Sequence, residues 1–132
     1  EATRYPDIGP APYQPQRLYY TAFPNRMVKF FTLLMRLRGQ DPKRAGRNKD
    51  IDWTRIGIEP RRLHAHIDYR RYWDVKRAAG AAHPSQGGGP SRSRMLPEPV
   101  QRRLMSTETF IRAYPSVPEG YREFDLFAGV EI

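Results

Sequence analysis

A β-type segment runs directly into a broadly amphipathic helix near the start of this chain, and this pair of elements limits the folds open to it. Residues 17–23, RLYYTAF, are rich in aromatic and β-favouring residues and predict a strand. Pro24 and Asn25 then open a helix over 25–38, in which apolar residues recur every three or four positions, and Gly39 ends it. So wide an apolar face needs a cover, which we expect from a partner or a missing half.

The rest of the chain alternates between short elements in a way that predicts an α/β fold. The expected elements are a strand over 61–69, a helix over 69–83 capped by Asp68, a helix over 98–105 and a strand over 107–114. Three irregular segments are also expected: an extended arm over 1–16, a flexible loop over 84–97, and a tail after 114 with an apolar plug at Leu126–Phe127. We expect residues 17–132 to form one unit.

Positive charge is concentrated outside the C-terminal segment. The chain has a net charge of +9, and 19 of its 23 basic residues are arginine. Residues 105–132 hold two arginines against five acidic residues, a net of −3, so the remainder carries +12. Such an excess of positive charge favours binding to a polyanion such as nucleic acid. We favour the alternative, a solvated arginine-rich surface without a nucleic-acid partner.

Several classes of protein are excluded by composition. Cysteine is absent, so disulfides and thiolate metal sites are ruled out. No uncharged apolar run approaches the roughly 18 residues of a membrane span, and residues 1–10 lack the regions of a signal peptide. We therefore expect a cytoplasmic protein without a membrane span. The chain starts without methionine, and we expect it to begin inside a longer protein.

Two histidines are spaced as zinc ligands can be. On a strand, the i, i+2 spacing of His64 and His66 places both imidazoles on one face. No third ligand with suitable spacing follows from the pattern. We therefore expect these to be partly exposed histidines beside Arg61 and Arg62, and we expect no metal site within this chain.

Asp50 and Asp52 are a candidate pair of catalytic carboxylates. Lys49 and Arg55 flank them, and no supporting constellation of residues surrounds them. We interpret the two acids as loop and capping residues. The glycine run QGGGP at 86–90 follows a predicted helix instead of preceding one, so it does not match a phosphate-binding loop.

A group of polar residues gathers at the predicted end of the helix over 69–83. His83 stands at the C-terminus, where the helix dipole favours an imidazolium, and Lys76 lies two turns earlier on the same face. Gln86, which can donate and accept hydrogen bonds, follows within one further turn of chain. This trio suits a polar substrate with hydroxyl groups. The alternative, that His83 only caps the helix by bonding a free carbonyl, stays open.

Several motifs in this order resemble a known family. The pattern GRN-x-DID-x-T-x-IG at 46–57 precedes the strand with Asp68, and KRAA-x-x-AH-x-SQ follows at 76–86. ETF-x-R-x-x-P begins at Glu108, and REFDLFAG lies in the tail. Together they resemble the C-terminal half of the LmbE / PIG-L family of zinc-dependent N-acetylglucosaminyl deacetylases, which includes mycothiol conjugate amidases.

The resemblance implies part of a Rossmann-like sheet with covering helices and long irregular loops. In this family a zinc ion activates water to attack an amide carbonyl of N-acyl glucosamine conjugates. The family's two metal-binding motifs, His-Pro-Asp-Asp-Glu and His-Pro-Asp-His, are absent here. We therefore expect the zinc ligands and the general base in an upstream half, on the same or a separate chain. No residue of this chain is assigned a catalytic role, and we expect the isolated chain to be inactive.

The resemblance implies that this chain forms a wall and a lid on the substrate side of the active site. The residues assigned to this role are Lys76, His83, Ser85 and Gln86, with Asp68 as a structural cap. The substrate implied is a small sugar amide. The competing hypothesis is a non-catalytic basic protein that binds nucleic acid, or a subunit that serves assembly.

Overall fold

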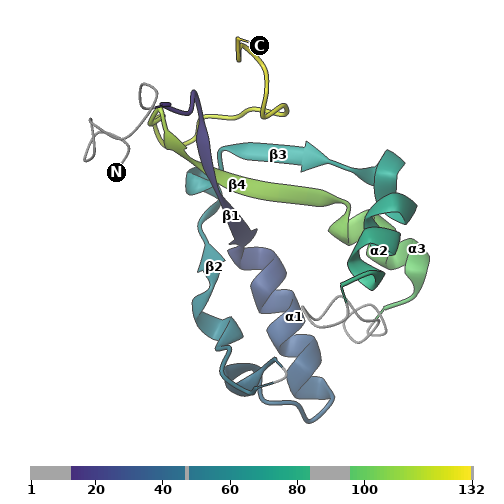
Figure 1. Ribbon diagram of the computed structural model, residues 1–132. Helices are drawn as coiled ribbons and strands as arrows, with labels where there is room; N and C mark the ends of the chain where they lie inside the picture. The colour runs from purple at the N-terminus through teal and green to yellow at the C-terminus, as the bar shows by residue number, and fades with distance from the viewer. Residues whose placement is uncertain (1–12, 47, 84–95, 132) are drawn as a thin grey trace, which may run out of the picture.

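The computed structural model describes residues 13–46, 48–83 and 96–131 (Figure 1). They form a four-stranded sheet of order β2-β1-β4-β3; helix α1 continues from the end of β1, and helices α2 and α3 lie together where β3 ends and β4 begins (Figure 1). The predicted α/β class is confirmed, and the arrangement is consistent with part of a Rossmann-like fold. The arm expected over 1–16 and the loop expected over 84–97 lie mostly outside the described residues.

The first strand and helix follow the prediction closely. Strand β1 (Leu18–Pro24) leads without a break into helix α1 (Asn25–Leu37). The helix closes where the Arg38 amide donates to the Met35 carbonyl at 3.0 Å. Gly39 follows with φ of +70°, a left-handed conformation that costs glycine little and that commonly ends helices. The predicted stop signal is therefore confirmed.

Strand β4 (Thr107–Tyr114) holds the sheet together, because it pairs antiparallel with strands from two distant parts of the chain. Phe110 of β4 lies opposite Thr21 of β1 and opposite the first residue of β3 (Ala65–Asp68). The short strand β2 (Gly57–Ile58) adds to the other side of β1 in parallel. Among the four strands this pair is parallel, whereas the other two pairs are antiparallel; Ala65 of β3 also forms an isolated parallel bridge with Glu123.

Two local contacts fix the segment that leads into β2. The carboxylate of Asp52 caps the 3₁₀ turn Trp53–Arg55, where it accepts from the Thr54 amide at 2.9 Å and from the Thr54 hydroxyl at 2.6 Å. This confirms its interpretation as a capping acid. Gly57 then packs against the start of α1, where an added Cβ would lie 3.1 Å from the Cα of Asn25. A larger residue at this position would push β2 away from the helix.

The second helix is shorter than predicted. Instead of extending over 69–83, helix α2 covers Trp73–Ala81, after a 3₁₀ turn. The 3₁₀ turn Arg70–Tyr72 takes the place of the predicted first α-helical turn. Asp68 Oδ1 accepts a hydrogen bond from the Arg70 amide at 2.8 Å at the start of this turn.

The C-terminal part follows the prediction except for its apolar plug. Helix α3 (Glu98–Met105) and β4 occupy the predicted ranges, and an irregular tail follows. The tail docks on the outer edge of β3, where the Glu123 amide donates to the His64 carbonyl and the His66 amide donates to the Glu123 carbonyl, both at 2.9 Å. The plug predicted at Leu126–Phe127 is wrong, because the phenylalanine is 71% exposed. The side chain that the tail buries is the charged one of Glu123.

Apolar side chains remain exposed along one side of α1. Val28 is buried, on a helix that contacts β2 and the neighbouring 3₁₀ turns, whereas Phe30, Leu33 and Leu37 are 43, 56 and 75% exposed. The described part of the chain therefore does not cover the whole apolar face of this helix. Among the described helices, none has the length and apolar character needed to cross a membrane.

Candidate functional site

Lys76 of α2, one of the predicted substrate-side residues, contacts one residue of β4 and one residue between β3 and α2. Its ammonium forms an ion pair with Glu108 of β4 and lies 4.4 Å from the centre of the Tyr69 ring. Tyr69 stacks on Trp73 at the start of α2, with ring centroids 6.1 Å apart and planes 6° from parallel. We call these four residues the Lys76 cluster. It offers a cationic donor, a carboxylate acceptor and aromatic surface beside one another.

The charged side chains of the Lys76 cluster are solvent-accessible, Tyr69 is half-buried, and Trp73 is buried. The Lys76 and Glu108 side chains are 44 and 40% exposed, whereas Trp73 is buried. The Tyr69 hydroxyl donates to the Met105 carbonyl at the end of α3. Burial raises the pKa of Tyr69, and the negative charge of Glu108 adds to the effect. The phenol is therefore neutral at pH 7, and its bond connects the segment before α2 to the end of α3.

His83 lies just beyond the end of α2. Its backbone amide donates to the Gly80 carbonyl at 3.1 Å, and its side chain is exposed. Ser85 and Gln86, the other predicted wall residues, lie outside the described residues. At the opposite end of the segment, Asp68 forms an exposed ion pair with its neighbour Arg70 at 3.0 Å, besides accepting that residue's amide. The structure thus places Lys76 and His83 on α2 and at its end, and it leaves the predicted trio untested.

The two histidines are held by protein groups. His64 is buried at 7% exposure, and its Nδ1 accepts from the backbone amide of Arg112 at 3.1 Å. His66 Nε2 lies 3.1 Å from the Leu63 carbonyl oxygen and contacts the Arg122 guanidinium. The expectation of partly exposed histidines is therefore wrong for His64, because the tail covers this edge of the sheet. Within the ranges that the structure describes, no group of three or more histidine and acidic residues could hold a metal ion.

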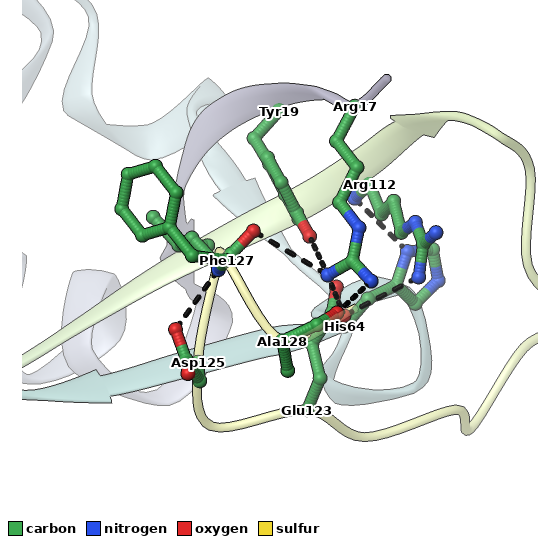
Figure 2. Close-up of polar contacts among 9 residues, drawn as sticks. Arg17, Tyr19, His64, Arg112, Glu123, Asp125, Phe127 and Ala128 are labelled. Atoms are coloured by element: carbon green, nitrogen blue, oxygen red, sulfur yellow. Dashed lines mark hydrogen bonds and ion pairs between the residues drawn. The ribbon is translucent and has the colours of Figure 1, made fainter. Parts of the chain in front are cut away.

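The strongest cluster of buried charge lies where the tail crosses the sheet (Figure 2). The Glu123 carboxylate, 8% exposed, lies between the guanidinium groups of Arg17 at 3.5 Å and Arg112 at 3.3 Å. Arg17 also donates to the carbonyls of Leu126 and Ala128, so one side chain binds the tail at several points (Figure 2). We call Arg17, Arg112 and Glu123 the tail clamp.

The contacts of the tail clamp indicate a structural role. Tyr19 borders it through its hydroxyl, which accepts from Arg17 at 3.4 Å, and burial raises the pKa of Tyr19 while the arginine opposes that rise. One carboxylate oxygen of Glu123 and the Nε of Arg112 are buried without a hydrogen-bond partner in the described part of the chain. The charges therefore stabilise each other through their mutual attraction, in a place that excludes water.

Sequence reasoning missed the tail clamp and the partner of Lys76. One feature of the sequence could have indicated the tail clamp. Arg112 is the charged residue in the run TFIRAY of β4, and a charge within a strand that is partly buried needs a partner of opposite charge. No local pattern, however, identifies Glu123 or Glu108 as the partner. The pairing depends on how distant strands and the tail meet.

Comparison with known proteins gives one informative similarity. The chain is 40% identical over 70 residues to 1D-myo-inositol 2-acetamido-2-deoxy-alpha-D-glucopyranoside deacetylase of Streptomyces griseus subsp. griseus. The match covers 52% of this chain and 22% of that enzyme. It relates about half of the chain to a deacetylase of an acetylated glucosamine conjugate.

The similarity remains partial. No family model matches the chain, and no solved structure matches it. The matched region corresponds to less than a quarter of the deacetylase. The match therefore does not extend the activity, substrate or partners of the whole enzyme to this chain.

Proposed function

We propose that this chain is the C-terminal part of a zinc-dependent de-N-acetylase or amidase that acts on N-acyl glucosamine conjugates. The observation that carries the proposal is the 40% identity over 70 residues to a deacetylase whose name specifies such a conjugate. The mixed α/β sheet agrees with it. In this proposal the chain supplies the substrate-side wall and lid, and it is inactive by itself.

In this proposal the Lys76 cluster forms part of the wall. A sugar amide presents hydroxyl groups that both donate and accept hydrogen bonds, and it also presents apolar ring faces. Lys76 can donate to a hydroxyl, Glu108 can accept from one, and the Tyr69 ring beside them offers apolar surface. His83, exposed at the end of the same helix, would add an imidazole that can form hydrogen bonds, and Ser85 and Gln86 would extend the wall.

The described residues of this chain do not fit a zinc site. Nδ1 of His64 accepts from the Arg112 backbone, and the His66 ring is engaged by Leu63 and Arg122, so neither imidazole is arranged with further ligands around a common point. We therefore assign the zinc ligands and the general base to the upstream half of the protein. No chemical step is assigned to residues of this chain.

The exposed side of α1 is where the upstream half would pack. Phe30, Leu33 and Leu37 present apolar surface that the described residues leave uncovered, and burying it would contribute about 25 cal/mol for each Å² removed from water. The chain aligns with only 22% of the related deacetylase, so a much larger part of such an enzyme lies elsewhere. We propose that this larger part, on the same chain or a second one, covers the helix.

The test compares the isolated chain with the chain joined to, or mixed with, its upstream half. Both are assayed for bound zinc and for deacetylation of the glucosamine–inositol conjugate named in the related enzyme. We expect zinc and activity only when the upstream half is present. Hydrolysis by the isolated chain, or tight zinc binding by it, would contradict the proposal.

A matched pair of variants tests the packing surface. Leu33→Asp on α1 should weaken association with the upstream half at least tenfold, because it places a charge in the apolar interface. Leu104→Asp on α3 is the control, since its side chain is similarly exposed, at 51% against 56%. If the Leu33→Asp and Leu104→Asp variants associate equally well with the upstream half, this packing is refuted.

A further inference from the structure

Three arginines line a surface hollow between α3 and the 3₁₀ turn that precedes α2. Arg70, Arg102 and Arg103 form its wall together with Pro99. The hollow is open to solvent and has a volume of about 690 Å³. Arg70 directly follows Tyr69 of the Lys76 cluster, but no lining residue belongs to that cluster, and the proposed function does not use the hollow.

Two of the three guanidinium groups are positioned by contacts on the protein side. Arg70 Nη2 lies 3.0 Å from Asp68 Oδ2, and Arg102 Nη2 donates to the Arg70 carbonyl at 3.3 Å. A guanidinium carries five N–H donors in a planar fork, so each of these contacts leaves most of the donors available to a ligand. The arginine side chains are thus partly preorganised, which reduces the entropy lost when an anion binds.

The charge around the hollow is unbalanced. Residues 68–77 and 98–105 contain six basic side chains and three acidic ones. Two of these acids form ion pairs: Asp68 with Arg70 of the lining at 3.0 Å, and Glu98 with Arg77, which lies outside the lining, at 2.7 Å. Arg102 and Arg103 therefore carry most of the unbalanced charge. The lining residues themselves include no carboxylate. Like charges gathered in this way repel one another, and an anion in the hollow would relieve that repulsion.

We propose that this hollow binds the phosphoryl group of a small phosphomonoester. A phosphate dianion presents three oxygens, which match the parallel donors of guanidinium groups, and it carries the charge needed to offset the cluster. A carboxylate brings one charge and two oxygens and therefore satisfies less of the site. Because the hollow is a concavity with room beyond one phosphate, the rest of the ligand can occupy it too. This site is independent of the proposed amidase function.

The proposal is tested by nuclear magnetic resonance titration of the ¹⁵N-labelled protein at low ionic strength. The probes are inorganic phosphate, glucose 6-phosphate and a single-stranded oligonucleotide. We expect saturable shifts with both phosphate probes, centred on the amide signals of Arg102 and Arg103. The double variant Arg102→Gln/Arg103→Gln should weaken binding at least tenfold, because it removes two of the three cations.

The control is Arg26→Gln/Arg36→Gln, which removes two exposed arginines of α1 and the same net charge. It should change the affinity less than twofold, and circular dichroism should show that both double variants remain folded. Equal weakening in the two double variants would mean non-specific attraction and would overturn the proposal. So would shifts with the oligonucleotide alone, which would indicate recognition of a phosphodiester backbone, or the absence of shifts with either phosphate probe.

Discussion

The tail clamp makes a quantitative prediction, because it places a carboxylate between two arginines with little access to water. Glu123→Gln keeps the shape of the side chain and removes its charge. Deleting one member of a buried ion pair costs about 3–5 kcal/mol, since the remaining charge stays buried and uncompensated. Arg17 keeps its carbonyl partners at Leu126 and Ala128, which lessens the loss. We therefore expect the free energy of unfolding to fall by about 3 kcal/mol, the lower end of that range.

Urea unfolding monitored by tryptophan fluorescence measures this loss. With a slope of about 1.5 kcal/mol per molar urea, the midpoint should fall by about 2 M. Glu119→Gln is the matched control, because it neutralises an exposed glutamate of the same tail and should shift the free energy by less than about 0.5 kcal/mol. If the two variants have the same midpoint and slope, the clamp does not stabilise the fold and the reasoning fails.

A double-mutant cycle separates the pair from its surroundings. Arg112→Gln alone leaves Glu123 with Arg17 as its cationic partner, and the double variant Glu123→Gln/Arg112→Gln removes both charges. We expect the double variant to lose less free energy of unfolding than the sum of the single losses, by about 1–3 kcal/mol. Strict additivity would show that the two side chains act independently.

Three further outcomes follow from the exposed and half-buried groups. Lys76→Met should lower the free energy of unfolding by less than about 1 kcal/mol, because its pair with Glu108 is solvent-exposed; urea unfolding checks this, and a larger loss would contradict it. The hydrogen bonds from Thr54 lower the pKa of Asp52 in the folded state, so the stability that they contribute is present above the unfolded pKa of about 3.9 and is lost as the pH falls through the folded value. The stability difference between the protein and its Asp52→Asn variant should therefore shrink between pH 5 and pH 2. Burial raises the pKa of Tyr69, so its neutral form favours folding and that contribution is lost as the pH rises above about 10; Tyr69→Phe should lose less stability than the parent chain between pH 9 and pH 11.

Local patterns were sufficient where a structure depends on neighbouring residues. The strand and helix over 18–37, the helix over 98–105 and the strand over 107–114 lie where apolar spacing and a glycine stop signal predict them. The capping role of Asp52 likewise rests on the next two residues of the chain. The same kind of reasoning placed the start of α2 too early, because residues Arg70–Tyr72 form a 3₁₀ turn before the α-helix begins at Trp73.

Local sequence patterns do not predict contacts between segments that are distant in the chain. His64 is buried because residues some 60 positions later cover it, and nothing near His64 in the sequence indicates that cover. The candidate site has the same limitation. Lys76 could be placed on a helix face, but its ion pair with Glu108 depends on β4 meeting α2, which the spacing of neither segment indicates.

The arginine excess of the chain illustrates why composition alone could not decide between partners. Arg17 and Arg112 are largely buried and hold the tail through Glu123, so their charges stabilise the fold and are not available to a ligand. Arg102 and Arg103 line an open hollow whose lining contains no carboxylate. The two groups add equally to the net charge of +9, yet they respond to salt differently, because buried pairs are screened far less than exposed charges. Added salt should therefore weaken phosphate binding at the hollow well before it loosens the tail.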